Sequence, residues 1–212
     1  SLLWEPNEYI NIMVYPFTDS QILGISTFPY SLKDFFLEGT QQVSASWITL
    51  ENLSFPYCIS INSSYIYEQS TDERINQNDA AITLAHELGH YLGLRHVFSE
   101  GGTTSMCTDT DYCKDTPSYN RSEYEQWLNN LDKQNKYQLK DLAKRYSCEK
   151  GEYEAHNIMD YAYCFYNEIT LEQRKRIRHI LNYSPLIPGP KESRIDTRGV
   201  QGRLNLPICI MK

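Results

Sequence analysis

The chain has 212 residues, 41% of them hydrophobic, which allows one substantial core or one domain divided by a cleft. Its formal net charge of -7 argues against nucleic acid as a partner, because phosphate binding requires clustered Lys and Arg. No apolar run approaches the ~20 residues of a transmembrane helix, so the sequence predicts no membrane-spanning segment.

The first seventy residues predict a small β-sheet. Residues 9–17 and 56–68 are rich in β-branched and aromatic residues and partly alternate, which is typical of strands. Residues 40–52 predict another strand with its loop, and residues 31–38 predict a short helix.

Residues 78–93 predict a helix that buries most of its circumference. Ala and Leu recur at helical spacing, Asn78 or Asp79 can cap the start, and Gly93 stands where a helix would end. At roughly 100° per residue, the helix keeps one narrow polar strip, which we expect to face a cleft. The residues of this strip are Asp79, Thr83, His86, Glu87 and His90.

The second half of the chain predicts helices joined by loops. Residues 99–121 are typical of a loop, and residues 122–146 predict one or two amphipathic helices. Residues 170–183 predict a final helix that begins with the spacing of a capping box. The residues from 184 onward hold four of the nine prolines, and we expect this tail to wrap the surface.

The stretch HELGHYLGLRH carries the strongest chemical signal. His86 and His90 are four residues apart, so a helix places both imidazoles on one face, within reach of one metal ion. Glu87 lies one step around, close enough to touch a metal-bound water. Gly93 accepts the backbone angles of a sharp turn, which can bring His96 round as a third nitrogen ligand. Three protein ligands leave a fourth position open, which is typical of a catalytic zinc site.

This arrangement predicts hydrolysis of peptide bonds. Zinc lowers the pKa of its water from about 15.7 toward about 7. Glu87 takes the proton, the hydroxide attacks the carbonyl, and Glu87 then passes the proton to the leaving amine. The alternative is a core helix with incidental histidines, which would have to meet five fixed positions in this stretch by chance.

At HNIMDYAYC (156–164) the sequence resembles the metzincin metalloproteases, in which HExxHxxGxxH is followed by a methionine-containing turn. By resemblance, Met159 supports the histidines from below, and Tyr161 steadies the tetrahedral intermediate. The order of HELGHYLGLRHVF, CKDTP (113–117), NIMDY and LEQRKRIRHIL is similar to the pappalysin branch, as is LGISTFP (23–29). Some bacterial members of this branch are zinc metalloproteinase lipoproteins.

The resemblance implies an α+β, metzincin-like zincin fold. A twisted mixed sheet with backing and active-site helices would come first, followed by a lower part with the Met-turn and a terminal helix. We expect one catalytic domain over 1–212, with an upper subdomain (1–93), a lower subdomain (94–183) and a tail (184–212). The substrate would lie extended along an edge strand, for which residues 56–68 are the candidate by position.

Six cysteines favour disulfides and an exported protein, with buried free thiols as the alternative. Spacing alone does not choose among the pairings. The resemblance implies two crossed disulfides in the lower part and leaves one further pair. These pairs are Cys107–Cys148, Cys113–Cys164 and Cys58–Cys209.

One loop holds three aspartates, Asp109, Asp111 and Asp115. The resemblance implies a structural calcium ion in this region, and hard cations prefer such carboxylates. A solvated acidic loop is the alternative. His156 and His179 have no partner at ligand spacing, so we interpret them as ordinary histidines.

We therefore predict a monomeric, secreted or surface-anchored zinc endopeptidase that acts on proteins or peptides. His86, His90 and His96 would bind Zn²⁺, with Glu87 as general base and acid. The alternatives are a catalytically silent zinc-containing peptide-binding or adhesin module, which would not need Glu87, and a fragment of a latent precursor. The chain starts without Met, so we expect a leader or pro-segment to precede it, where a lipid anchor could be attached.

Overall fold

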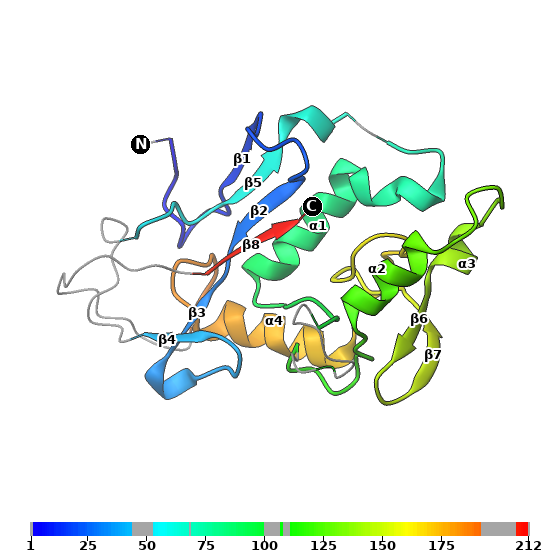
Figure 1. Ribbon diagram of the computed structural model, residues 1–212. Coiled ribbons are helices and arrows are strands. Elements are labelled where there is room, and N and C mark those ends of the chain that lie inside the picture. The colour runs from blue at the N-terminus through cyan, green and yellow to red at the C-terminus, as the bar shows by residue number, and fades with distance from the viewer. Residues whose placement is uncertain are drawn as a thin grey trace.

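The computed structural model describes residues 2–43, 53–67, 69–99, 107, 111–191 and 207–211, and its fold is α+β, as predicted (Figure 1). Its main element is a four-stranded mixed sheet with the strand order β1-β5-β2-β8. β5 runs parallel to β1 and antiparallel to β2, and β8 runs antiparallel to β2. The strands are β1 (Ile12–Tyr15), β2 (Gly24–Thr27), β5 (Ile59–Asn62) and β8 (Ile208–Met211).

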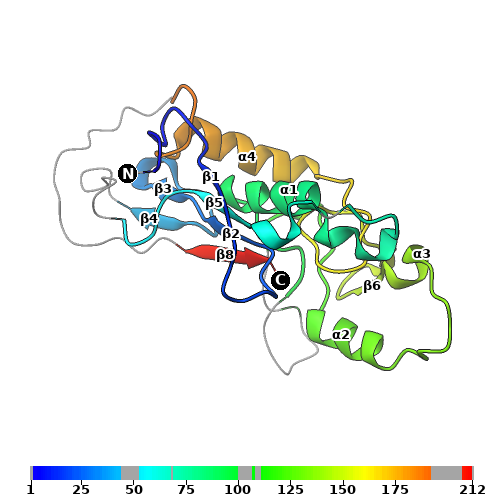
Figure 2. The same ribbon diagram turned by 90° about the horizontal axis from the view of Figure 1, so that it is seen from above.

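Two helices build the main core together with this sheet. α1 (Ala80–Tyr91) lies beside α4 (Leu171–Tyr183), as Figure 2 shows from above. Tyr91 of α1 and Ile180 of α4 are fully buried against Ile59 and Ile61 of β5. β3 (Tyr30–Leu32), which pairs in parallel with β4 (Gln41–Val43), contributes Tyr30 and Leu32 to the same core.

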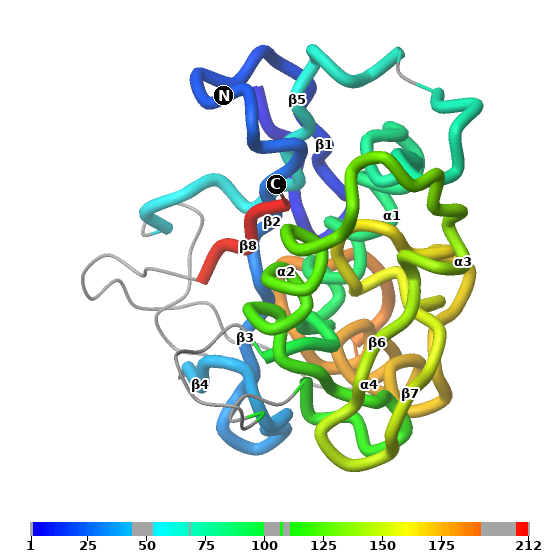
Figure 3. Tube along the Cα trace, turned by 45° about the vertical axis from the view of Figure 1, so that its right-hand side comes forward, coloured from blue at the N-terminus to red at the C-terminus, as the bar shows by residue number. Residues whose placement is uncertain are grey.

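The remaining elements gather on the side of the molecule away from β1 and β5 (Figure 3). They are α2 (Arg121–Asn129), α3 (Leu139–Leu142), β6 (Lys144–Ser147) and β7 (Gly151–Glu154). β6 and β7 form an antiparallel pair. None of the helices in the described part of the chain combines the length and the hydropathy that crossing a membrane requires.

Arg145 links these elements to the loop that follows Met159. Its side chain is fully buried, and its guanidinium donates to the carbonyl oxygens of Leu142 (3.0 Å) and Ala162 (2.8 Å). Its Nε lies 3.6 Å from Oδ2 of Asp160, and Oδ1 of the same carboxylate accepts a 2.5 Å hydrogen bond from the Tyr119 hydroxyl. Burial is the largest single effect and disfavours the charged guanidinium, but Asp160, Tyr119 and Tyr124 together outweigh it and raise the pKa of Arg145.

The end of α1 is a Schellman motif. The backbone N–H of Leu94 donates to Gly89 (2.9 Å) and that of Gly93 donates to His90 (2.9 Å). Gly93 has a φ of +88°, a left-handed value that the missing side chain permits. The turn predicted at Gly93 is therefore present, and it carries the chain away from the helix axis toward His96.

Gly93→Ala is expected to destabilise the protein by about 2–4 kcal/mol in urea unfolding, combining left-handed strain and overpacking. An added Cβ would lie 2.7 Å from Cγ1 of Ile180 in the core. Gly151→Ala is the matched control, since Gly151 has a φ of +81° and nothing within 4 Å of the added Cβ. An equal loss of unfolding free energy in both variants would show that the clash with Ile180 does not contribute to the destabilisation.

Several predicted elements differ in extent from the observed ones. Residues 31–38 contain only a 3₁₀ turn, Lys33–Phe35, because Tyr30–Leu32 is extended. The end of the helical prediction at 122–146 is wrong, since residues 144–147 form β6. Of the strand predicted at 40–52, the described part is Gln41–Val43, and residues 44–52 lie outside the described residues. The helix at 170–183 is confirmed, with the predicted Thr170–Gln173 capping box.

Two expectations about the sheet are wrong. The candidate edge strand at 56–68 is β5, which lies between β1 and β2 and is hydrogen-bonded on both sides. In the tail, which we expect to wrap the surface, Ile208–Met211 instead joins the sheet as β8, and residues 192–206 lie outside the described residues. In both cases the pairing partner is distant in the sequence, so local patterning does not identify it.

One predicted disulfide, Cys107–Cys148, is present. Cys113 and Cys164 are both buried and not joined, and the Cys164 thiol instead donates to the Asn157 carbonyl oxygen. That second predicted disulfide is therefore absent. Cys113 and Cys164 are instead buried thiols, as in the alternative interpretation.

The predicted Cys58–Cys209 disulfide is also absent. Cys209 lies opposite Ser26 on one side of β2, and Cys58 bonds to Thr27 on the other side. Neighbouring strands are spaced by about 4.8 Å, and Cys58 and Cys209 lie on either side of β2, so their Cα atoms are about 10 Å apart. That separation exceeds the ~7 Å limit for a disulfide.

Candidate active site

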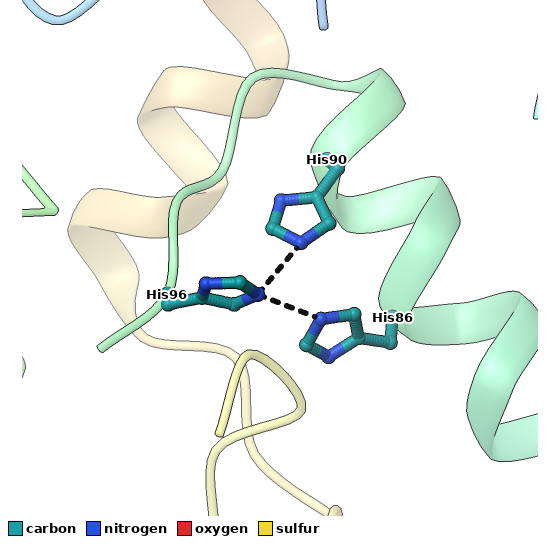
Figure 4. A group of neighbouring side chains, drawn as sticks. All are labelled: His86, His90 and His96. Atoms are coloured by element: carbon teal, nitrogen blue, oxygen red, sulfur yellow. Dashed lines mark hydrogen bonds between the residues drawn. The ribbon is translucent and has the colours of Figure 1, made fainter. Parts of the chain in front are cut away.

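Three histidine side chains converge beside α1 (Figure 4). His86 and His90 project from the same face of the helix, and His96 comes from the extended segment after Gly93. The Nε2 atom of His96 lies 3.2 Å from Nε2 of His86 and 3.0 Å from Nε2 of His90. The structure therefore brings together the three residues that the spacing predicts.

Backbone carbonyl groups orient two of these imidazoles. Nδ1 of His86 lies 2.7 Å from the Ile158 carbonyl oxygen, and Nδ1 of His90 lies 2.8 Å from that of Leu94. A carbonyl oxygen can only accept, so each Nδ1 carries the proton and each Nε2 presents its lone pair. This support is the usual arrangement behind a metal-ligating histidine.

The histidines are held in the neutral form that binds metals. Burial lowers the pKa of His86 to about 4. Burial, followed by the neighbouring imidazoles, also lowers the pKa values of His90 and His96. Metal binding requires deprotonated imidazole nitrogen, so burial removes the competing proton at neutral pH.

The donor set fits a zinc ion. Among the residues that the structure describes, these histidines are the only group of three or more His, Cys, Asp or Glu side chains close enough to share a metal. Three imidazoles with their tautomers set by backbone acceptors are a donor set of catalytic zinc sites. His156 and His179 lie elsewhere, bonded to Asn167 and to the Phe35 carbonyl oxygen respectively.

Glu87 lies next to the histidines with its carboxylate fully buried. Burial raises the pKa of Glu87, and the backbone N–H of Met211 acts in the opposite direction. This contact is not a regular hydrogen bond, because within the described residues neither carboxylate oxygen has a hydrogen-bond partner. Gly24 of β2 makes room for the side chain, since a Cβ there would lie 2.6 Å from Cγ of Glu87.

Met159 lies directly beneath the histidine-bearing helix. It is fully buried with Leu94 and Val97, and its sulfur fills the space that a side chain at Gly89 would need. The carbonyl group of the preceding residue, Ile158, is the one that orients His86. The segment predicted as the Met-turn therefore contacts the helix at two points.

Tyr161 is buried against two of the histidines. Its ring centroid lies 4.5 Å from that of His96 and 5.4 Å from that of His86. Its hydroxyl donates a 2.5 Å hydrogen bond to the Ile210 carbonyl oxygen of β8. The guanidinium of Arg121, the first residue of α2, lies 4.6 Å above the ring.

Two of the three predicted calcium ligands, Asp111 and Asp115, have protein partners. Asp111 accepts from the Thr116 hydroxyl (2.7 Å) and the Cys113 backbone N–H (3.0 Å). Asp115 accepts from the Thr170 hydroxyl and the Glu172 backbone N–H, so it caps the start of α4. Asp109 lies outside the described residues.

Sequence reasoning missed three contributors to this site. Gly24 belongs to LGISTFP, but its contact with Glu87 is between distant segments and leaves no local pattern. Arg145 follows Lys144 in a segment that predicts a helix, where both side chains would be expected in solvent. Met211 lies in a short apolar run that gives no sign of where it packs.

Comparison with known proteins gives a family and several relatives. The Peptidase_M43 family model, described as Pregnancy-associated plasma protein-A, matches residues 39–182. An extracellular metalloprotease of Arthroderma benhamiae is 37% identical over 108 residues, covering 50% of this chain and 32% of that protein. An extracellular metalloprotease of Arthroderma otae is 32% identical over 171 residues, covering 79% of this chain and 49% of that protein.

The chain thus spans about half the length of these curated relatives, or less. Among solved structures, mature mirolysin of Tannerella forsythia in complex with a cleaved peptide is 21% identical. That comparison has a TM-score of 0.49 and covers 83% of this chain and 53% of the mirolysin chain. The family match covers more than half of this chain and includes the histidines, Glu87 and Met159. The chain therefore belongs to the Peptidase_M43 family of pappalysin-like metzincin metalloproteases.

Proposed function

We propose that this chain is the catalytic unit of a zinc-dependent endopeptidase. The observation that carries the proposal is the convergence of three imidazole Nε2 atoms, two of them from the helix that also carries the buried carboxylate of Glu87. Membership in a metalloprotease family supports it. His86, His90 and His96 would hold the metal.

The side chains around the histidines have separate roles in this proposal. When bound, zinc polarises the scissile carbonyl and makes water nucleophilic at neutral pH. Glu87 accepts a proton from the attacking water and returns it to the leaving amine nitrogen. The Tyr161 hydroxyl donates to the substrate carbonyl oxygen, which gains negative charge during attack. Met159 supports the histidine-bearing helix from below.

Further parts of the proposal concern the whole protein. The disulfide and the relatives named extracellular metalloproteases support export to an oxidising compartment. We propose a protein or peptide substrate and a monomeric enzyme. Attachment to a cell surface through a lipid, and a calcium ion near Asp111, stay predictions.

Hydrolysis of a quenched-fluorescent peptide library tests the proposal. Protein carrying one zinc per chain is expected to cleave peptides, to stop when an excess of chelator is added, and to resume when zinc is restored. Mass spectrometry of the products would show internal cleavage, as an endopeptidase requires. No turnover on any peptide from zinc-loaded protein would contradict the proposal and favour the peptide-binding module.

Zinc is also expected to raise the thermal stability of the protein. At a free concentration of roughly 100 times its Kd, zinc stabilises the folded state by about 2.7 kcal/mol. For a chain of this size that corresponds to a rise in Tm of about 5–10 °C, measured by calorimetry of chelated and reloaded protein. His90→Ala should lose this rise, whereas the control His156→Ala should keep it. An equal rise in both variants would place the zinc elsewhere.

A further inference from the structure

The C-terminal strand β8 covers the edge of β2 that lies beside the catalytic groups. Figures 1 and 2 show β8 along β2 next to α1. The two strands pair antiparallel, with Cys209 opposite Ser26 and Met211 opposite Gly24. The pairing is extended by hydrogen bonds from Leu23 N–H to the Met211 carbonyl oxygen (2.7 Å) and from Phe28 N–H to that of Pro207 (2.8 Å). Without β8, β2 would be an open edge strand, which is a template for an extended peptide.

One peptide bond of β8 lies at the catalytic groups. The Ile210 carbonyl oxygen accepts the hydrogen bond from the Tyr161 hydroxyl. The next residue, Met211, pairs with Gly24, where an added Cβ would lie 2.6 Å from Cγ of Glu87. This amide therefore lies beside Tyr161 and Glu87. In the proposed mechanism these side chains act on the carbonyl oxygen and on the leaving nitrogen of a substrate. Completing the sheet does not by itself require this register of β8 on β2, which places the Ile210–Met211 amide beside Tyr161 and Glu87.

The Met211 side chain is held as firmly as its backbone. It is 1% exposed, and it packs in a mainly aromatic cluster. The other members of this cluster are Leu23, Phe98, Tyr119, Tyr124 and Tyr161. The cluster joins the edge of β2 to α2 and to the loop after Met159, and it surrounds the Met211 side chain. Ile208, three residues earlier, is 42% exposed and makes no such contact with the cluster.

We propose that Pro207–Met211 is an intramolecular ligand of the peptide-binding groove and must leave β2 before a peptide substrate can bind. This inference rests on the proposed function, because it identifies the groove by the groups assigned to catalysis. A segment of the same chain competes at an effective concentration on the order of 1 mM. If it binds with a Kd of about 0.1 mM, it weakens the apparent affinity of a competing peptide about tenfold.

The first test is a reversible covalent lock between β8 and β2. Ser26→Cys places a thiol directly opposite Cys209, and directly paired strand residues have Cα separations that a disulfide can span. The probe is a fluorescently labelled synthetic peptide with the sequence of residues 204–212, LNLPICIMK, with Ser in place of Cys. Oxidised Ser26→Cys should not bind this probe, and reduction should restore the wild-type affinity. Wild-type protein under the same two conditions controls for the Cys107–Cys148 disulfide.

The second test weakens the segment without locking it. Met211→Asp places a carboxylate in the apolar cluster, so β8 should dissociate and the probe should bind about tenfold more tightly than to wild type. Ile208→Asp changes an exposed position of the same strand and should bind the probe like the wild type. Circular dichroism and calorimetry establish that each variant is folded.

The outcomes separate this inference from the proposed function. Probe binding that is equal in wild type, Met211→Asp and the oxidised lock would overturn the inference, whatever the enzyme activity. Probe binding that follows the expected order, without hydrolysis of any peptide by zinc-loaded protein, would support the occupied groove and contradict the endopeptidase. Where hydrolysis is present, KM for a peptide substrate should fall about tenfold in Met211→Asp.

Discussion

Glu87→Gln is expected to reduce the rate of peptide hydrolysis by about 10²–10⁴-fold, the usual contribution of a general acid–base group. The amide keeps the shape of the side chain but cannot accept the proton of the attacking water. The three histidines are unchanged, so zinc should stay bound at one ion per chain. Initial rates on a fluorogenic peptide, together with metal analysis of the same sample, measure both quantities.

Glu123→Gln is the matched control, because Glu123 lies in the first turn of α2 and takes no part in the proposed chemistry. Its activity should equal that of the wild type. Glu87→Gln is also expected to be at least as stable as the wild type, because it removes a buried carboxylate without a hydrogen-bond partner among the described residues. A Glu87→Gln variant that keeps full activity would rule out Glu87 as the base.

Arg145→Leu is expected to lower the free energy of unfolding by about 3–5 kcal/mol, because it leaves the buried Asp160 carboxylate without its cation. For a protein of this size, Tm should fall by about 6–20 °C. The backbone carbonyl groups of Leu142 and Ala162 also lose the hydrogen bonds from Arg145, and that of Leu142 keeps the one from the Tyr124 hydroxyl. Urea unfolding followed by fluorescence measures the change.

Two further variants define the cause of that loss. Lys144→Leu removes the cation of an exposed ion pair with Glu152 (3.3 Å), in the same strand as Arg145, and should cost no more than about 1 kcal/mol. Asp160→Asn in the Arg145→Leu background should recover part of the stability, since it removes the uncompensated charge. If the double variant is no more stable than Arg145→Leu, the loss comes from packing and not from the ion pair.

The histidine cluster could be predicted because its information is local. Ten residues separate His86 from His96, and a helix followed by a glycine turn is enough to bring their side chains together. The helix at 170–183 was predictable for a similar reason, since its capping box and apolar spacing lie within its own sequence.

The sheet could not be predicted to the same depth, because strand pairing joins distant segments. Residues 59–62 alternate like many edge strands, and nothing in them shows that β1 and β2 cover both sides. The stretch ICIM is too short and too uniformly apolar to indicate a partner. The burial of Arg145 could not be predicted either. Its partner Asp160 is distant in the sequence, so nothing near Arg145 indicates a buried ion pair.

The orientation of the histidines has a consequence for how the sequence can vary. Nδ1 of His86 and Nδ1 of His90 are both held by main-chain oxygens, those of Ile158 and Leu94. Every residue type supplies the same oxygen, so side-chain replacement at 94 or 158 changes the packing but leaves the hydrogen-bond acceptor in place. The backbone conformation therefore determines the tautomers of His86 and His90, and only a change in that conformation can alter them.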